Sequence, residues 1–122
     1  MPKFRFAAAL LGVLCAAAAS PALAHVLLVQ ADPPPNATVH AAPAALTLRF
    51  SEPIALALCQ VLVRDATGRE AQITAIPVPG ATPSDVVVKL FPLTPGAYRV
   101  EWRAVARDSH NSNGSYSFTF TP

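Results

Sequence analysis

The sequence predicts an all-β domain built as an antiparallel β-sandwich of seven strands. Apolar residues recur with a period of two in successive runs, whereas helical periodicity is nearly absent after residue 25. Turn-forming segments rich in Pro, Gly, Asn and Asp separate these runs, and the chain holds 13 prolines. Seven short alternating runs within about 100 residues are typical of a two-sheet sandwich, with a small barrel as the alternative.

The expected strands follow one another along the chain from residue 26. In each run apolar side chains alternate with polar ones, so that one face of the strand can be buried. The clearest example is "AYRVEWRAVAR", where Tyr98, Val100 and Trp102 share one face. The runs cover residues 26–31, 46–50 ("LTLRF"), 59–65 ("CQVLVRD"), a stretch near 70–76, 86–90 ("VVVKL"), 97–107 ("AYRVEWRAVAR") and 114–120 ("GSYSFTF").

The inward phase of these runs predicts the core. Cys59 shares that phase with Val61 and Val63, so we expect a small buried side chain rather than a ligand or redox thiol. The segment "LTPGAY" resembles a tyrosine corner, in which Tyr98 bonds back to the preceding loop. These features favour a Greek-key sandwich of immunoglobulin or cupredoxin-like type. The other inward residues are Leu46, Leu48, Phe50, Val86, Val88, Leu90, Val100, Trp102, Ala104, Ala106, Tyr116, Phe118 and Phe120.

Residues 1–24 have the features of a cleaved export signal. Lys3 and Arg5 precede an apolar run, and "ALA" at residues 22–24 is a small-x-small cleavage site. The apolar run is too short to span a bilayer, which needs about 20 residues. Cleavage of these 24 of the 122 residues would leave one domain, residues 25–122, as a soluble periplasmic protein.

The composition excludes several functions for the exported domain. Two of the nine basic residues lie in the signal, which leaves seven against seven acidic residues and no net charge. This balance does not indicate a nucleic-acid or anionic-membrane surface. Of the two cysteines, Cys15 would leave with the signal, so Cys59 has no disulfide partner within the chain, and whether it ever links two copies stays open. We expect a monomer. Phosphate-binding loops, Ser-His-Asp arrangements and paired catalytic carboxylates are not found, so we do not expect an enzyme.

Cleavage after Ala24 would make His25 the first residue of the domain. Its α-amine and Nδ1 could then close a six-membered chelate ring on one metal ion. Asp108 and His110 lie two residues apart in "RDSHNSNG", which puts them on one side of an extended chain, about 6.6 Å apart. Alone, such a pair is typical of a polar turn. Together with an N-terminal histidine, it predicts a metal site.

The donor set of this site suits oxidised copper. Three nitrogens and one oxygen in a tetragonal plane favour Cu(II), one ion per monomer, with zinc as the second choice. Cu(I) prefers thioether and thiolate ligands. The only methionine is Met1, however, and Cys59 is expected in the core, so Cu(I) should bind poorly.

Taken together, these segments resemble the CopC family of periplasmic copper-resistance proteins. The resemblance rests on "AHVLLVQADPPPNATV", "LTLRFSEPI", "VLVRDATGRE", "LTPGAYRVEWRAVARDSH" and "NGSYSFTF", and it covers nearly all of residues 25–122. It implies an exported β-sandwich with a Cu(II) site formed by His25, Asp108 and His110. It also implies a role in copper resistance and homeostasis as a carrier or buffer, with a CopD-like inner-membrane protein as partner.

The sequence departs from the family pattern at two points. The family loop usually reads D-G-H, whereas this chain has Ser109, which we expect to tighten the turn. The Met-rich Cu(I) loop of some members is missing, which places this chain with members that bind only Cu(II).

Two other functions stay open at this stage. One is a copper-dependent oxidative enzyme with an N-terminal histidine brace, like the lytic polysaccharide monooxygenases, although Asp108 would fill a position that oxygen needs. The other is a metal-free interaction module. Of the remaining polar residues, His40 in "NATVHAAP" is expected to be exposed, and Glu52 in "FSEPI" to be a hydrogen-bonding or turn carboxylate rather than a ligand.

Overall fold

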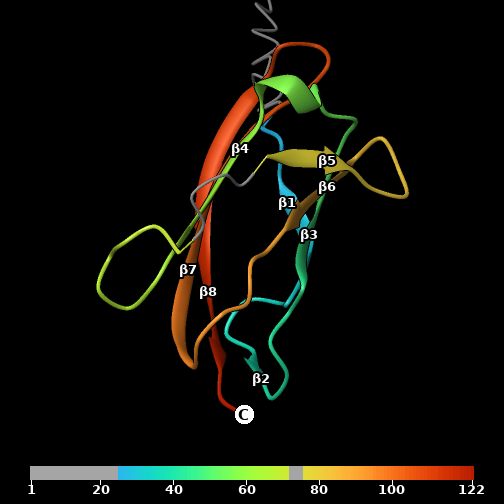
Figure 1. Cartoon of the computed structure of the whole chain (residues 1–122). Helices are drawn as coiled ribbons and strands as arrows, with labels where there is room; N and C mark the ends of the chain where they lie inside the picture. Colours follow the sequence, from blue (N-terminus) through green and yellow to red (C-terminus); the bar gives the residue numbers. More distant parts are fainter. Residues whose placement is uncertain (1–24, 72–75) are drawn as a thin grey trace, which may run out of the picture.

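The computed structural model describes residues 25–71 and 76–122, which form a sandwich of two four-stranded sheets (Figure 1). The strand order is β1-β3-β6-β5 in the first sheet and β2-β8-β7-β4 in the second. The chain repeatedly passes from one sheet to the other, and the predicted all-β sandwich is confirmed. The elements are β1 (Leu28–Asp32), β2 (Thr38–Val39), β3 (Ala45–Phe50), the 3-10 turn η1 (Leu56–Leu58), β4 (Gln60–Arg64), β5 (Pro77–Pro79), β6 (Asp85–Lys89), β7 (Gly96–Val105) and β8 (Asn111–Phe120).

The short edge strands differ from the sequence prediction. β2 has two residues and pairs in parallel with the end of β8, so the sandwich is not antiparallel throughout. The strand expected near 70–76 falls partly on residues 72–75, outside the described part of the chain. Within the described part, Glu70 forms only an isolated bridge with Arg64, and β5 is the edge strand that pairs with β6 on the side away from β3. Such short strands depend on a neighbouring edge, which alternation along the chain does not reveal.

The core lies between the two sheets and follows the predicted phase. Leu46, Leu48, Val86, Val88 and Val100 are fully buried, and they come from β3, β6 and β7. Cys59 is also buried, as expected for a small apolar side chain. Trp102 is half-buried and its ring makes an edge contact with Phe50, at 5.2 Å between ring centroids. The tyrosine corner is confirmed, because the Tyr98 hydroxyl donates to the carbonyl of Thr94. No helix within the described ranges has the length and apolar character needed to cross a bilayer.

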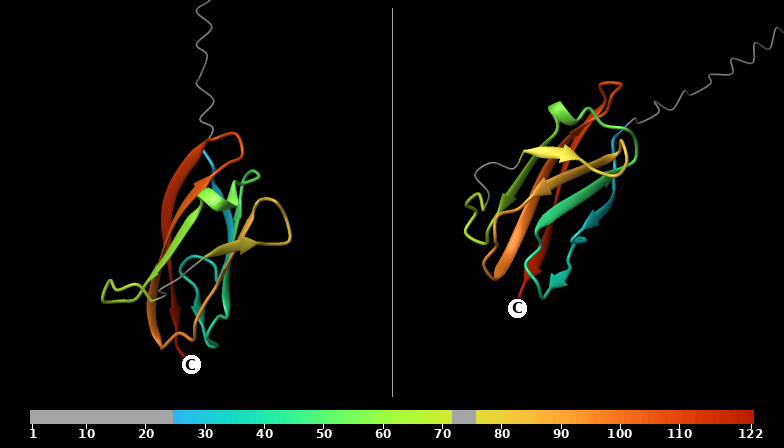
Figure 2. Two further views of the ribbon diagram at one scale, coloured as in Figure 1. Left: turned by 45° about the horizontal axis from the view of Figure 1, so that its top comes forward. Right: turned by 45° about the vertical axis from the view of Figure 1, so that its right-hand side comes forward.

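The two ends of the sandwich carry different elements, as the views in Figure 2 agree. The β7–β8 hairpin turn, η1 and the beginning of the described chain lie at one end. β2 and the C-terminus lie at the opposite end. The sequence-predicted ligands therefore fall at a single end of the molecule, the one that carries the hairpin turn.

An ion pair between a buried carboxylate and a partly exposed arginine links β3 and β6 and makes the fold sensitive to acid. Asp85 is 3% exposed; its carboxylate accepts a hydrogen bond from Arg49 Nε at 2.8 Å and another from the Thr82 amide at 2.9 Å. The hydrogen bond from Arg49, aided by Thr82, lowers the pKa of Asp85 below its ordinary value, although desolvation opposes this. A lowered pKa in the folded state stabilises the protein above about pH 4, and this contribution is lost as the pH falls through the folded value.

We therefore expect Asp85→Asn to lower the free energy of unfolding at pH 7 by about 1–3 kcal/mol. The difference from the unmodified protein should shrink as the pH falls from 5 to 2, because the native carboxylate is then protonated as well. Urea unfolding of both proteins over this pH series measures the effect. If the free energies of unfolding of the two proteins differed by the same amount at every pH, the charge of Asp85 would contribute nothing to stability.

Candidate metal centre

The Asp-x-His motif lies in the tight turn that joins β7 to β8. The turn is closed by hydrogen bonds from the Ala106 amide to the His110 carbonyl at 2.7 Å and from the Ser109 amide to the Ala106 carbonyl at 3.0 Å. Ser109 has a φ of 75°, in the left-handed region where glycine is the least strained residue. This backbone conformation explains why a glycine suits the middle position, and Ser109 adopts it nonetheless. β8 begins at Asn111, so the predicted polar loop is shorter than expected.

The turn holds the side chains of Asp108 and His110 against each other. Asp108 Oδ2 lies 2.8 Å from His110 Nδ1, and Asp108 Oδ1 accepts the His110 backbone amide at 3.2 Å. The amide hydrogen bond, with the His110 ring adding to it, lowers the pKa of Asp108 against an opposing desolvation, so the carboxylate is anionic at neutral pH. With the ring proton on Nδ1, His110 Nε2 carries a free lone pair, as in many metal-binding histidines. Each carboxylate oxygen also keeps a lone pair for a metal.

A third ligand candidate, Glu52, comes from the segment that follows β3. The residues after it pair with the end of β7: Ile54 forms a bridge with Ala106, and the Arg107 amide donates to the Pro53 carbonyl at 3.2 Å. This pairing carries Glu52 to the hairpin turn. The potential ligand atoms of Glu52, Asp108 and His110 all lie within 4.8 Å of one another.

The structure differs from part of the expectation for Glu52. One oxygen of its carboxylate, Oε1, is buried and has no hydrogen-bond partner among the described residues. A buried carboxylate oxygen without a partner is costly, and a bound cation would compensate it. A sequence signal was present: Glu52 is the single charged residue between β3 and β4, directly before a proline.

His25 lies at the same end of the sandwich but outside the group formed by Glu52, Asp108 and His110. The next two residues fix its position. The Val26 carbonyl accepts a hydrogen bond from the Ser112 hydroxyl, and Leu27 exchanges hydrogen bonds with Ser51, which precedes Glu52. His25 is exposed and lines a hollow of about 540 Å³ together with Arg103, Asn111, Ser112 and Asn113.

The residues that converge here offer hard and borderline donors at an open surface. The side chains of Asp108 and His110 are about half exposed, so an ion could enter and leave without a conformational change. Carboxylate oxygen and imidazole nitrogen suit Cu(II) and Zn(II), whereas Cu(I) prefers sulfur. The buried Cys59 thiol is directed at the backbone, with the carbonyls of Ala55 and Val105 at 3.4 and 3.9 Å.

The remaining histidine, His40, lies at the opposite end of the molecule. It precedes β3 and follows β2, which pairs with the last residues of β8. As predicted, it is exposed, and its Nδ1 lies 2.8 Å from the carbonyl oxygen of Thr121. It is not among the residues whose potential ligand atoms converge, which are Glu52, Asp108 and His110.

Comparison with known proteins matches this architecture to copper-resistance proteins. A family model described as the CopC domain matches residues 28–121. Copper resistance protein C of Escherichia coli is 36% identical over 120 residues, which cover 92% of this chain and 94% of that protein. The crystal structure of CopC from Methylosinus trichosporium OB3b superimposes with a TM-score of 0.75 and 29% identity, covering 80% of this chain and 95% of that one. PcoC, a methionine-rich copper resistance protein from Escherichia coli, gives a TM-score of 0.71 and 32% identity, covering 80% of this chain and all of that one.

Proposed function

The chain belongs to the CopC family, and from this premise we propose that it is a copper-binding protein of copper resistance that holds Cu(II) at the hairpin end of the sandwich. The observation that carries the proposal is the convergence of Glu52, Asp108 and His110 at the end of the sandwich where the described chain begins. The orphaned Oε1 of Glu52 supports a cation at this place.

The proposed site takes one Cu(II) ion per chain. His25 would contribute its α-amine and Nδ1 after removal of residues 1–24, His110 its Nε2, and Asp108 a carboxylate oxygen. Glu52 is added to the set that the sequence predicted, as a further oxygen donor or as a negative charge beside the ion. The open surface and the absence of sulfur ligands within the described part of the site favour a protein that takes up Cu(II) and releases it.

The proposed location is the periplasm, where an exported domain could buffer copper or pass it to a CopD-like inner-membrane protein. The contrast with PcoC supports a Cu(II) preference, because that relative is described as methionine-rich whereas this chain has one methionine, Met1. A carrier needs no vacant coordination position for oxygen, and the presence of two carboxylates around His110 suits binding better than oxygen activation.

Thermal unfolding with and without copper tests the proposal. A ligand that binds only the folded state adds RT ln(1 + [L]/Kd) to its stability, about 4 kcal/mol at a thousand times Kd. We therefore expect Cu(II) to raise the melting temperature of the domain that begins at His25. Acidification should remove the rise, because protons compete for the amine and the imidazoles.

The same melt after anaerobic reduction to Cu(I) provides the control. The rise should largely disappear, since the ligands are nitrogen and oxygen. A rise that survives reduction would contradict the Cu(II) assignment and direct attention to Cys59. Unfolding that ignores copper in either oxidation state would favour the metal-free interaction module.

A further inference from the structure

A polar groove runs over the outer face of the second sheet, on the side opposite the core. Its volume is about 400 Å³, and it is floored by the backbones and outward side chains of β4, β7 and β8. Neither the proposed metal site nor the core explains it. Its lining residues include Gln60 and Leu62 from β4, Arg99, Glu101 and Arg103 from β7, and Ser115 from β8.

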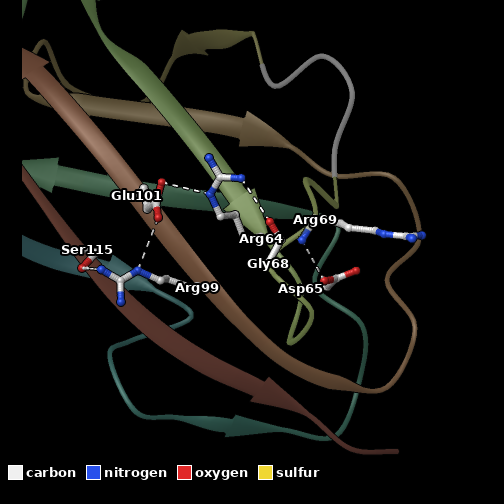
Figure 3. A network of polar contacts seen from close by, with 7 residues as sticks. All are labelled: Arg64, Asp65, Gly68, Arg69, Arg99, Glu101 and Ser115. Atoms are coloured by element: carbon white, nitrogen blue, oxygen red, sulfur yellow. Dashed lines mark hydrogen bonds and ion pairs between the residues drawn. The ribbon is translucent and has the colours of Figure 1, made fainter.

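The groove carries more positive than negative charge. Glu101 is shared between Arg64, at 3.2 Å, and Arg99, at 3.5 Å, and Arg99 also donates to the Ser115 hydroxyl at 3.0 Å (Figure 3). The side chain of Arg103 has no hydrogen-bond or ion-pair partner among the described residues, although its backbone is paired within the sheet. In and beside the groove there are thus three guanidinium groups, those of Arg64, Arg99 and Arg103, and one carboxylate, that of Glu101. Because residues 25–122 have equal numbers of acidic and basic residues, this excess is a local property of the face.

The arrangement of the arginines gives the face a direction. Arg99 and Arg103 lie four residues apart on one side of β7, which corresponds to about 13 Å along the strand. Arg103 also lines the hollow beside His25, as does Asn113, so the groove and the hollow adjoin. The row formed by Arg99 and Arg103 therefore leads along β7 toward the end of the molecule that holds Asp108 and His110.

We propose that this face is a docking surface for an acidic segment of a partner protein, which lies extended along β7 with its carboxylates on Arg99 and Arg103. An extended segment with acidic residues four positions apart matches the spacing of the two guanidinium groups. A small carboxylate ion is too short to reach both. Guanidinium groups bind carboxylates in a bidentate manner, and such complementarity mainly sets orientation and association rate.

Docking in this orientation would bring the partner's chain to His25. In that respect the inference extends the proposed function, because a copper-exchanging partner would gain access to the ion. The electrostatic contact itself needs no copper. It is therefore tested on the metal-free protein, and a failure of copper binding would leave the result unaffected.

The test uses the full domain from His25 and a short fluorescent peptide with glutamate at every fourth position, separated by serine and glycine. Fluorescence anisotropy measures binding at low salt, where exposed charges are least screened. We expect saturable binding that weakens with added salt. In a nitrogen-15 NMR titration, the amide shifts should concentrate on β7 and β8.

Three variants make the result specific. Arg103→Gln and Arg99→Gln should each weaken peptide binding about fivefold. Arg69→Gln is the matched control: Arg69 does not line the groove, its side chain extends away from Arg99 and Glu101 in Figure 3, and the substitution removes the same charge. Removing one positive charge anywhere on the domain weakens attraction to an acidic peptide slightly. Apart from this general effect, the affinity of the Arg69→Gln variant should stay within about 1.5-fold of that of the unmodified domain.

Other outcomes would overturn the proposal. Equal losses in the Arg69 and Arg103 variants would mean that only net charge matters. Citrate that competes with the peptide and binds as tightly would indicate a small-anion site at Arg103. Tighter binding to vesicles rich in phosphatidylglycerol than to the peptide would indicate a lipid surface, and shifts confined to residues outside β7 and β8 would place the contact elsewhere.

Discussion

Acetylation of the α-amine of His25 is expected to lower the Cu(II) affinity of the domain at least about 100-fold. Loss of groups that merely orient a ligand costs 10–100-fold in metal affinity, and a direct ligand should cost no less. Acetylation removes the amine from the chelate ring while leaving the imidazole in place. Val26 and Leu27 are both hydrogen-bonded to segments that flank Glu52, Asp108 and His110, so His25 is held at that end of the molecule.

The experiment compares two proteins that begin at His25 and differ only in the acetyl group. Acetylation is cleaner than an added residue, because an extra residue would present its own amine together with the amide of His25. The only lysine beyond the signal is Lys89, so Lys89→Arg in both proteins prevents modification of a second amine. Competition with a Cu(II) chelator gives the affinities. Equal values would show that the amine is not a ligand.

His110→Ala is expected to reduce Cu(II) affinity by at least about 100-fold and to leave the fold of the metal-free protein intact. The turn is closed by the backbone of His110, whose carbonyl accepts the Ala106 amide, and alanine preserves this bond. The lost contact with Asp108 is an exposed pair, and such pairs contribute little to stability. The melting temperature without copper should therefore change little.

His40→Ala is the matched control for this substitution. His40 is also exposed and also bonded through Nδ1, but it lies at the opposite end of the sandwich, against Thr121. Copper titration should give the same affinity for this variant as for the unmodified domain. Comparable weakening in both variants would indicate non-specific binding by surface histidines and would contradict the site.

Much of the fold could be predicted because alternation is a local property of a strand. The inward residues of β3, β4 and β7, for example Leu48, Val61 and Val100, are buried as their spacing requires. The limits of the strands were less predictable. Asn111 and Ser112 read as loop residues, yet they belong to β8, because β7 offers them hydrogen-bonding partners in register. The two-residue β2 forms only where the edge of β8 is available.

In the candidate site, too, some features follow from local sequence and others only from tertiary structure. Asp108 and His110 are two residues apart, so their sequence spacing alone predicts that they lie close together, and the turn holds Asp108 Oδ2 2.8 Å from His110 Nδ1. Glu52 lies 56 positions before Asp108, and only the pairing of Ile54 with Ala106 carries it to the turn. His25 reaches the same end because Leu27 pairs with Ser51. Composition and short motifs thus predicted copper as the metal and two neighbouring residues as candidate ligands. Only the tertiary structure decided that Oε1 of Glu52 is buried without a hydrogen-bond partner among the described residues. The reason is that its environment is formed by strands distant in sequence.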